Sequence, residues 1–366
     1  MKIVTNREDL IKPLNMLGGV VEKRQTLPIL ANILINADKE KLRITATDLE
    51  VELKTQAPVS ESNEIDFTLP ARKLIDICRA LPENSTISMD VSGEKAIITA
   101  GRSRFTLGVL PAKDYPAIEI DGAIKSFKVK EKVLKRLIEK TQFAMAQQDV
   151  RYYLNGLLLE MQDGMLRAVA TDGHRLAISE EGDSQGESED FQIIIPRKAV
   201  LELGRMLEEG DNEVAVEVGS NNVRIIMGDT IFTSKLIDGK FPDYKKVIPA
   251  GTDKHVVINR EVIKQALHRT SILSNEKYRG IRFNFENNNL ELLAHNPEQE
   301  EAKEELEIEY SGDKLVIGFN VGYLIEVLSA INDENVILEL KDENSSCLIR
   351  SEKTEDSRYV VMPMRI

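Results

Sequence analysis

Residues 42–50 (LRITATDLE) form a strand-like run that ends in a polar turn, and the chain contains two further runs of this kind. Residues 166–174 read LRAVATDGH, and residues 290–298 read LELLAHNPE. The leading leucines and the alanines four residues later recur at a constant spacing of 124 residues. Self-similarity at a constant period is typical of a chain built from duplicated units.

A second set of matches follows at nearly the same spacing. Residues 69–73 (LPARK) recur as residues 195–198 (IPRK), and Tyr115-Pro116 recurs as Phe241-Pro242, 126 residues later. The third copy is weaker here, because Gly318-Phe319-Asn320 stands where the other two have the proline. These matches predict three homologous domains, at residues 1–120, 121–250 and 251–366.

Each copy also has the same order of expected elements: a short strand, a helix, alternating strands, a second helix and further strands. Strands are expected at 30–36 and 41–47, and Pro13 is expected near the start of the first helix. The pattern predicts an α+β fold, with about six to eight strands per domain and two helices on one face of an antiparallel sheet. The helices are expected at residues 7–17, 71–81, 133–145, 197–209, 260–269 and 321–331.

Composition narrows the class of protein. The chain has 366 residues, 42% of them apolar, which is enough for packed cores. No apolar run has the length of a signal peptide or of a membrane span. Cys78 and Cys347 are the two cysteines, and both lie in apolar stretches without CxxC spacing. We therefore expect a cytoplasmic protein with two buried, reduced thiols and no membrane partner.

Charge is distributed unevenly. The six expected helices together carry a net charge of +6, taking residues 130–140 for the third, while the whole chain carries −13. A protein this acidic is not a typical non-specific DNA-binding protein. Basic helices gathered on one surface could nevertheless face a polyanion, with the acidic remainder repelling it elsewhere. Solvated helix faces are the simpler interpretation, and the charge count leaves both open.

The sequence lacks the histidine spacing of a metal site and the glycine-rich loop of a phosphate site. The four histidines are His174, His255, His268 and His295, without HxxxH or HxH spacing. There is no GxxxxGK[ST] phosphate loop. The sequence therefore predicts no catalytic residue, no metal and no cofactor, although paired carboxylates for a metal nuclease remain open from composition alone.

Several long motifs run through the whole chain. They are residues 27–30 (LPIL), 47–50 (TDLE), 70–73 (PARK), 101–105 (GRSRF), 149–156 (DVRYYLNG), 170–176 (ATDGHRL), 238–244 (DGKFPDY), 273–277 (LSNEK), 296–301 (NPEQEE) and 359–366 (YVVMPMRI). Together they resemble the bacterial DNA polymerase III beta subunit family, the beta sliding clamps.

The resemblance implies a fold and a function. Each chain would supply three DNA-clamp domains, and two chains would join head to tail as a homodimer, a six-domain ring with helices lining the hole. The ring would encircle double-stranded DNA without sequence specificity and act as a processivity factor in the DNA polymerase III holoenzyme. It would be a non-catalytic subunit, loaded in DNA replication by a separate ATP-dependent clamp loader.

The resemblance also implies a partner-peptide pocket between the second and third domains. Its partners would be the DNA polymerase III alpha subunit, the clamp loader, translesion polymerases, mismatch-repair proteins and DNA ligase. An apolar pocket with methionines can accept varied ligands. Carried over by position, its residues would be Leu154, Thr171, Gly173, His174, Arg175, Leu176, Pro242, Val247, Val360, Val361, Met362, Pro363 and Met364.

A DNA contact follows from the family in the same way. Arg24, Gln148, Tyr152 and Tyr153 would touch the duplex or the single strand beside it, since adjacent aromatic rings can stack on bases. We expect the two tyrosines to lie in a strand, on opposite faces. Diffuse phosphate contacts are expected from helix residues, namely Arg72, Lys73, Arg197 and Lys198, with Lys12, Arg79, Lys135, Arg136, Lys140, Arg205, Lys264 and Arg269 as weaker candidates.

The dimer interface would pair the first domain of one chain with the third domain of the other. Basic residues would face acidic ones, and such pairs steer association more than they add affinity. The first domain would contribute Arg102, Arg104, Phe105 and Leu107, and the third Ile272, Leu273, Glu298, Glu300, Glu301, Glu304 and Glu305.

Other interpretations stay open from the sequence. The chain could be a specialised clamp paralogue, for example one that confers resistance to a clamp-binding toxin. It could also be a repeat scaffold that does not bind nucleic acid. Enzymatic activity is a further alternative, for which Asp172 beside His174 would be the starting point.

Overall fold

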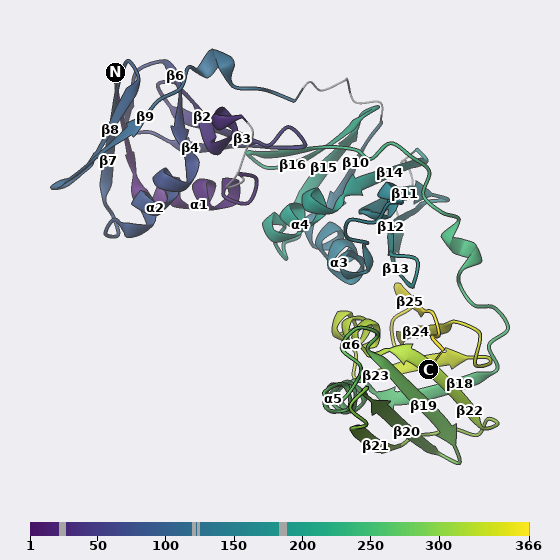
Figure 1. Ribbon diagram of the computed structural model, residues 1–366. Coiled ribbons are helices and arrows are strands. Elements are labelled where there is room, and N and C mark those ends of the chain that lie inside the picture. The colour runs from purple at the N-terminus through teal and green to yellow at the C-terminus, as the bar shows by residue number, and fades with distance from the viewer. Residues whose placement is uncertain (22–26, 119–121, 123–124, 183–188, 366) are drawn as a thin grey trace. The chain divides into compact units, whose positions relative to one another are not determined.

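A computed structural model describes the chain except for residues 22–26, 119–121, 123–124, 183–188 and 366 (Figure 1). The chain divides into two compact units. The first unit contains Met1–Lys132 and Leu201–Leu236, and the second contains Val133–Val200 and Ile237–Ile366. In the described residues, every paired strand of the four sheets runs antiparallel to its neighbour.

The first unit begins with a five-stranded sheet in the order β5-β1-β7-β8-β9. Ile87, Met89 and Val91 are buried at alternate positions of β7, as expected for a strand with one face on a core. Strand β9 lies at the edge of this sheet. The strands are β1 (Lys2–Asn6), β5 (Glu61–Ser62), β7 (Thr86–Ser92), β8 (Lys95–Ala100) and β9 (Ser103–Gly108).

An eight-stranded sheet completes the first unit, in the order β10-β15-β16-β17-β4-β3-β2-β6. Its middle is the pairing of β17 with β4, where Phe232 lies opposite Leu53. Four strands therefore come from the first sequence copy and four from the second. They are β2 (Asn32–Ala37), β3 (Lys41–Thr47), β4 (Val51–Pro58), β6 (Ile65–Pro70), β10 (Lys125–Lys130), β15 (Glu213–Val218), β16 (Asn222–Met227) and β17 (Thr230–Lys235).

The second unit contains an eight-stranded sheet of the same design, in the order β14-β11-β12-β13-β25-β24-β23-β18. Its middle is the pairing of β13 with β25, which joins the second copy to the third. The strands are β11 (Gly156–Gln162), β12 (Met165–Thr171), β13 (Arg175–Gly182), β14 (Phe191–Pro196), β18 (Lys254–Asn259), β23 (Asn335–Leu340), β24 (Cys347–Ser351) and β25 (Ser357–Val361).

A four-stranded sheet, β21-β20-β19-β22, lies beside it in the second unit, with β21 at one edge. Phe283, Phe285 and Phe319 are fully buried on this sheet. Because the chain has no tryptophan, these phenylalanines are among its largest core residues. The strands are β19 (Gly280–Glu286), β20 (Asn289–His295), β21 (Glu301–Glu307) and β22 (Leu315–Asn320).

Six α-helices occur in the described residues, two for each sequence copy. Asn259 and Asn320 cap α5 and α6, because each side-chain oxygen accepts two backbone N–H groups of the first turn. Helix α1 packs on α2, and α5 packs on α6. The helices are α1 (Arg7–Leu17), α2 (Ala71–Ala80), α3 (Glu131–Thr141), α4 (Arg197–Met206), α5 (Arg260–Ser271) and α6 (Val321–Ala330). Short 3₁₀ turns are η1 (Pro28–Ala31), η2 (Ala112–Asp114), η3 (Gln142–Ala144), η4 (Tyr152–Leu154) and η5 (Tyr244–Lys246).

The α+β class and the threefold repeat are confirmed. Two local expectations are wrong. Pro13 lies inside α1 rather than near its start, where it is buried with Leu10, Leu14 and Leu17, so packing outweighs the lost backbone hydrogen bond. The strand expected at 30–36 begins only at Asn32, because η1, with Pro28 as its first residue, precedes it. The first copy also has nine described strands, one more than predicted, since β5 adds a two-residue strand.

Candidate functional site

An apolar cluster lies on one face of the sheet where β13 meets β25. Leu176 and Val360 lie directly opposite each other across this pairing and are almost fully buried. Tyr153 and Val247 pack against the cluster and are partly buried. We call the set the β13–β25 cluster: Leu158, Val169, Leu176, Ile178, Ile194, Phe241, Tyr244, Leu348 and Val360, with Tyr153, Ile237, Val247 and Ile248 packed against it.

The linker between the second and third copies covers the cluster and is held by a buried hydrogen bond. The Tyr244 hydroxyl donates to a carboxylate oxygen of Glu160, which is 3% exposed. Gln192 donates to the other oxygen at 3.1 Å, and Arg167 lies 3.7 Å from the carboxylate. Burial and the Glu160 carboxylate both raise the pKa of the Tyr244 phenol, so it remains protonated and donates.

Replacing Tyr244 by phenylalanine is expected to lower the free energy of unfolding by about 1–2 kcal/mol, because the buried Glu160 carboxylate loses a donor. Urea denaturation, monitored by circular dichroism, measures this change in the free energy of unfolding. The matched control is Tyr278→Phe, since Tyr278 is 56% exposed and should change stability little. Equal effects of the two substitutions would contradict the assignment of the Tyr244–Glu160 bond as an anchor.

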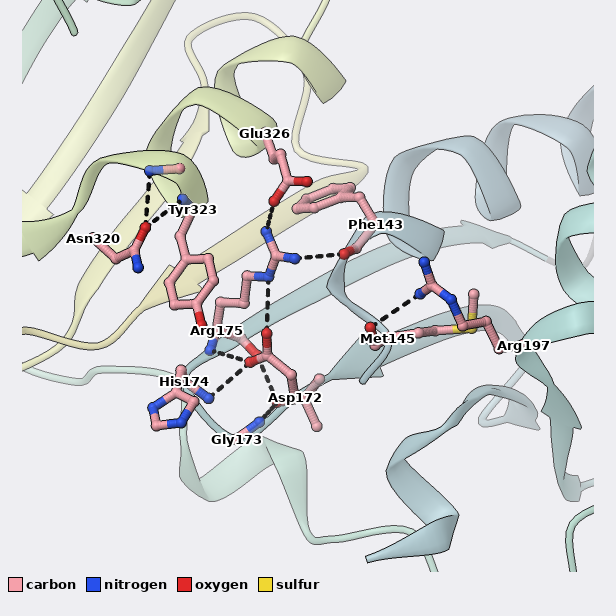
Figure 2. A network of polar contacts seen from close by, with 12 residues as sticks. Phe143, Met145, Asp172, Gly173, His174, Arg175, Arg197, Asn320, Tyr323 and Glu326 are labelled. Carbon is pink, nitrogen blue, oxygen red and sulfur yellow. Dashed lines mark hydrogen bonds and ion pairs between the residues drawn. The ribbon is translucent and has the colours of Figure 1, made fainter. Parts of the chain in front are cut away.

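A tight turn, residues 171–175, forms the rim beside the cluster (Figure 2). The Asp172 carboxylate accepts the backbone N–H groups of His174 and Arg175 at 2.9 and 3.0 Å. Gly173 has φ +89, which side chains disfavour, and a Cβ there would lie 2.9 Å from the Arg151 guanidinium. A side chain at this position would therefore be strained.

Arg175 is the central residue of the network in Figure 2. It is 8% exposed, donates to the Phe143 carbonyl at 2.6 Å and to Asp172 at 3.1 Å, and forms an ion pair with Glu326 of α6. Its guanidinium carbon lies 4.5 Å from the ring centroid of Tyr323. These contacts join the second copy to the third, so Arg175 has a structural role in the described structure.

The last described residues run along the same rim. The Met362 amide donates to the His174 carbonyl at 2.9 Å, and the Met364 amide donates to Gly318 at 2.8 Å. Met362 is 37% exposed, which is unusual for an apolar side chain beside a buried cluster. A cavity of about 450 Å³ lies next to Met364 and Arg365, with Tyr278 and His295 among the residues that line it.

The predicted pocket residues fall into three groups by exposure. Leu154, Arg175, Leu176, Val360 and Val361 are buried, whereas His174, Pro242 and Met362 are exposed. The partly buried members are Thr171, Gly173, Val247, Pro363 and Met364.

Sequence reasoning missed several contributors, among them Phe241, Tyr244, Leu348 and Tyr323. In the sequence, Phe241 was recognised as a repeated position and not as a pocket residue. The pairing of Leu348 with Val360 is seen only in the strand register.

The candidate DNA-contacting residues lie on one loop and in one short helix. Tyr152 and Tyr153 are in the 3₁₀ turn η4 and not in a strand, which corrects our expectation. Their rings are 5.8 Å apart, edge to face, and Tyr152 is 57% exposed while Tyr153 packs against the β13–β25 cluster. Gln148 is exposed, with φ +57. Arg24 lies outside the described residues.

Several basic helix residues are held by contacts within the chain. Arg136 pairs with Asp356 at 2.6 Å and with Glu181 at 2.5 Å, and Lys140 donates to the carbonyl of Ala330 at 2.5 Å. These two side chains therefore join α3 to the third copy. Of the four main candidates, Arg72 donates to Val21 O at 3.0 Å, Arg197 donates to Met145 O at 3.1 Å, Lys73 is exposed, and Lys198 is partly buried.

The candidate dimer residues lie at or near two unpaired sheet edges, one in each unit. In the first unit, Arg104 on β9 is exposed, Phe105 is partly buried and Leu107 is buried; Arg102, just before the strand, is exposed.

In the second unit, Ile272 is 76% exposed and Leu273 is partly buried, near β21. Glu304 is bound by Arg269 of the same chain at 2.7 and 2.8 Å, which lowers the pKa of its carboxyl. The remaining glutamates, Glu298, Glu300, Glu301 and Glu305, are exposed.

Comparison with known proteins matches each copy to a different domain of one family. Models of the N-terminal, central and C-terminal domains of the DNA polymerase III beta subunit match residues 1–119, 128–243 and 245–365. The chain belongs to the DNA polymerase III beta subunit family. Members of this family are beta sliding clamps, and the chain is thereby a sliding clamp, a processivity factor of DNA replication.

Relatives of known name agree over the full length. The beta sliding clamp of Pseudomonas aeruginosa is 52% identical and that of Escherichia coli 48% identical, each with 100% of both chains covered. A crystal structure of the DNA polymerase III subunit beta from Pseudomonas aeruginosa matches with a TM-score of 0.97 at 50% identity, again covering 100% of both chains.

Within the described residues, no group of three or more His, Cys, Asp or Glu side chains could hold a metal ion. The same residues contain no helix that is long and apolar enough to cross a membrane.

Proposed function

We propose that two copies of this chain form a closed ring around duplex DNA and tether replication and repair proteins to it. The observation that carries the proposal is the match of all three copies to the three clamp domains in order. A ring that stays on DNA raises the effective concentration of a tethered polymerase at the primer end, so linkage supplies processivity without tight binding.

The β13–β25 cluster and its rim are the proposed tether point. An apolar side chain of a partner peptide would bury itself against Leu176, Val247 and Val360, with Met362 adapting its shape to different partners. The His174–Tyr323 pair, with rings 6.4 Å apart and nearly parallel, would flank the peptide. The partners are the polymerase alpha subunit, the clamp loader, translesion polymerases, mismatch-repair proteins and DNA ligase.

The ring would close through the β9 and β21 edges of neighbouring copies. Each edge has unpaired backbone groups, which a strand from another chain can satisfy. Arg102 and Arg104 beside β9 are basic, and Glu298, Glu300 and Glu301 near β21 are acidic. Edges of opposite charge on one chain favour head-to-tail association, which closes into a ring when the rotation allows it.

Replacing Ile272 by aspartate is expected to weaken self-association by about tenfold or more, because an exposed apolar contact becomes a buried charge in the dimer. Sedimentation velocity over a range of protein concentrations measures the dissociation constant. Val262→Asp is the control, since Val262 is also an exposed apolar residue of α5, 48% exposed, outside the proposed interface. Unchanged self-association of Ile272→Asp would argue against this interface.

Contacts to DNA would go to phosphates and not to base edges, so the ring could slide. Tyr152 is the side chain best exposed for stacking on an unpaired base, and Gln148 lies on the loop just before it. The positively charged helix residues, Arg72, Lys73, Arg197 and Lys198 first, would contribute a diffuse field that attracts the duplex.

Retention on nicked circular DNA, after loading by a clamp loader with ATP, tests the function. We expect the circle to hold the protein through high salt and linearisation to release it, because a closed ring leaves only from an end. If both DNA forms release the protein alike as salt rises, binding is electrostatic and the encirclement proposal is wrong.

A further inference from the structure

The two eight-stranded sheets have the same strand order, so each position around the β13–β25 pairing has a counterpart around the β17–β4 pairing. The register makes the match exact to the residue. Thr171 lies opposite Leu176, which lies opposite Val360. In the other sheet, Thr47 lies opposite Glu52, which lies opposite Thr233.

Backbone geometry supports the same correspondence. The amide of Met362 donates to the carbonyl of His174, and the amide of Lys235 donates to the carbonyl of Glu50 at 2.8 Å. The turn residues also agree, since Gly173 has φ +89 and its counterpart Leu49 has φ +77. The first unit therefore contains a second junction of the same build.

The chemistry of the two junctions is opposite. Where the β13–β25 cluster is apolar, the counterparts in the first unit are mostly polar or charged. Leu158, Val169, Leu176, Ile178, Ile194, Leu348, Val360 and Met362 correspond in order to Leu34, Thr45, Glu52, Lys54, Thr68, Arg224, Thr233 and Lys235.

Glu52 is the central member of this polar set. It is 1% exposed, and Lys54 lies 2.7 Å from one of its carboxylate oxygens. The backbone N–H of Ile118, in the linker between the first and second copies, donates to the other oxygen at 3.3 Å. The hydroxyl of Thr233 is buried and has no hydrogen-bond partner in the described part of the chain.

Space is available at this junction. A cavity of about 520 Å³ lies there, lined by Leu49, Ala117, Ile118, Asn221, Asn222, Lys235 and Leu236. Lack of room is therefore not what excludes a peptide here. Lys235 lines this cavity, and so does Ile118, whose backbone binds the buried Glu52 carboxylate. An apolar side chain entering here would cover the lysine without satisfying it, which costs free energy that an apolar contact does not return.

We propose that Glu52, Thr233 and Lys235 determine specificity by making the first junction reject the apolar peptide that the second accepts. One chain then holds one partner peptide, although its repeat builds two junctions. This inference rests on the proposed function of the β13–β25 cluster. The difference in peptide binding between the two junctions is thereby attributed to three side chains and not to the shape of the sheet.

Exchange of side chains between the junctions tests the proposal. The probe is a labelled linear hexapeptide with apolar anchors, selected for binding to the native chain, and calorimetric titration measures the number of sites per chain. The native chain is expected to bind one peptide. The triple variant Glu52→Leu, Thr233→Val, Lys235→Met, with its folding checked by circular dichroism, is expected to bind two.

The reciprocal exchange needs only small changes in the second junction. Val360→Thr with Met362→Lys keeps the size of both side chains, but the buried hydroxyl at position 360 costs free energy, so circular dichroism checks that the variant is folded. We expect the peptide to bind about tenfold more weakly or worse. Glu52→Gln is the control for the loss of one charge alone and should leave one site.

The outcomes separate the two proposals. If no linear hexapeptide with apolar anchors can be selected for binding to the native chain, the proposed tether function fails and takes this inference with it. If the native chain binds two peptides, or the folded triple variant still binds one, only the specificity inference is overturned. Undiminished binding by the Val360→Thr, Met362→Lys variant would also overturn it.

Discussion

Replacing Arg175 by methionine is expected to lower the free energy of unfolding of the second unit by about 2–4 kcal/mol. The guanidinium is nearly buried and joins α6, η3 and the 171–175 turn through Glu326, the Phe143 carbonyl and Asp172. Methionine keeps much of the volume but donates to none of these three acceptors, so each loses its hydrogen bond or ion pair with Arg175. The stacking of the cation on Tyr323 is lost as well.

Hydrogen exchange in graded urea measures this effect, since the chain has no tryptophan to report unfolding. Amides of β13 and β25 should exchange faster in the variant. Arg151→Met is the matched control, because Arg151 pairs with Asp149 at 2.8 Å on the surface and its side chain is 46% exposed. This control substitution should lower the free energy of unfolding by less than about 1 kcal/mol. An equal loss of unfolding free energy in the two variants would show that the stabilisation does not depend on the burial of Arg175.

Removing residues 362–366 is expected to weaken partner-peptide binding by about 100-fold or more while the chain still self-associates. The segment carries Met362 and Met364, whose amides bind the His174 and Gly318 carbonyls along the rim. Strand β25 ends at Val361, so its pairing with β13 is retained. A 100-fold change corresponds to about 2.7 kcal/mol, which the loss of one well-buried apolar anchor can supply.

Fluorescence polarisation of a labelled peptide measures the affinity, and sedimentation velocity measures self-association of the same truncated chain. Arg365→Ala is the control, since Arg365 is exposed and should affect neither reading strongly. If the truncated chain loses self-association as well as peptide binding, the peptide-binding surface and the self-association surface are not separate. Retained peptide binding would exclude the C-terminal segment from the tether point.

The local elements could be predicted because they depend on short-range patterns. The 7–17 helix matches α1, and the helices at 71–81, 260–269 and 321–331 end within two residues of the structure. The polar turn after each repeated run was also visible, since Asp172 and Gly173 are the residue types such a turn requires. The two tyrosines at 152–153 were misassigned, because two adjacent aromatics are as compatible with a strand as with a 3₁₀ turn.

The amino-acid sequence by itself determined the threefold repeat, the α+β class and the order of elements, because each copy carries its own hydrophobic periodicity and turn residues. Only the tertiary structure decided which strands of one copy pair with the next and which charges meet. Tyr244 and Glu160 are 84 residues apart, and Arg175 and Glu326 are 151 apart. Contacts at such separations arise from the packing of whole sheets, so no local pattern records them. The opposite chemistry of two junctions built alike became visible only when their strand registers were compared.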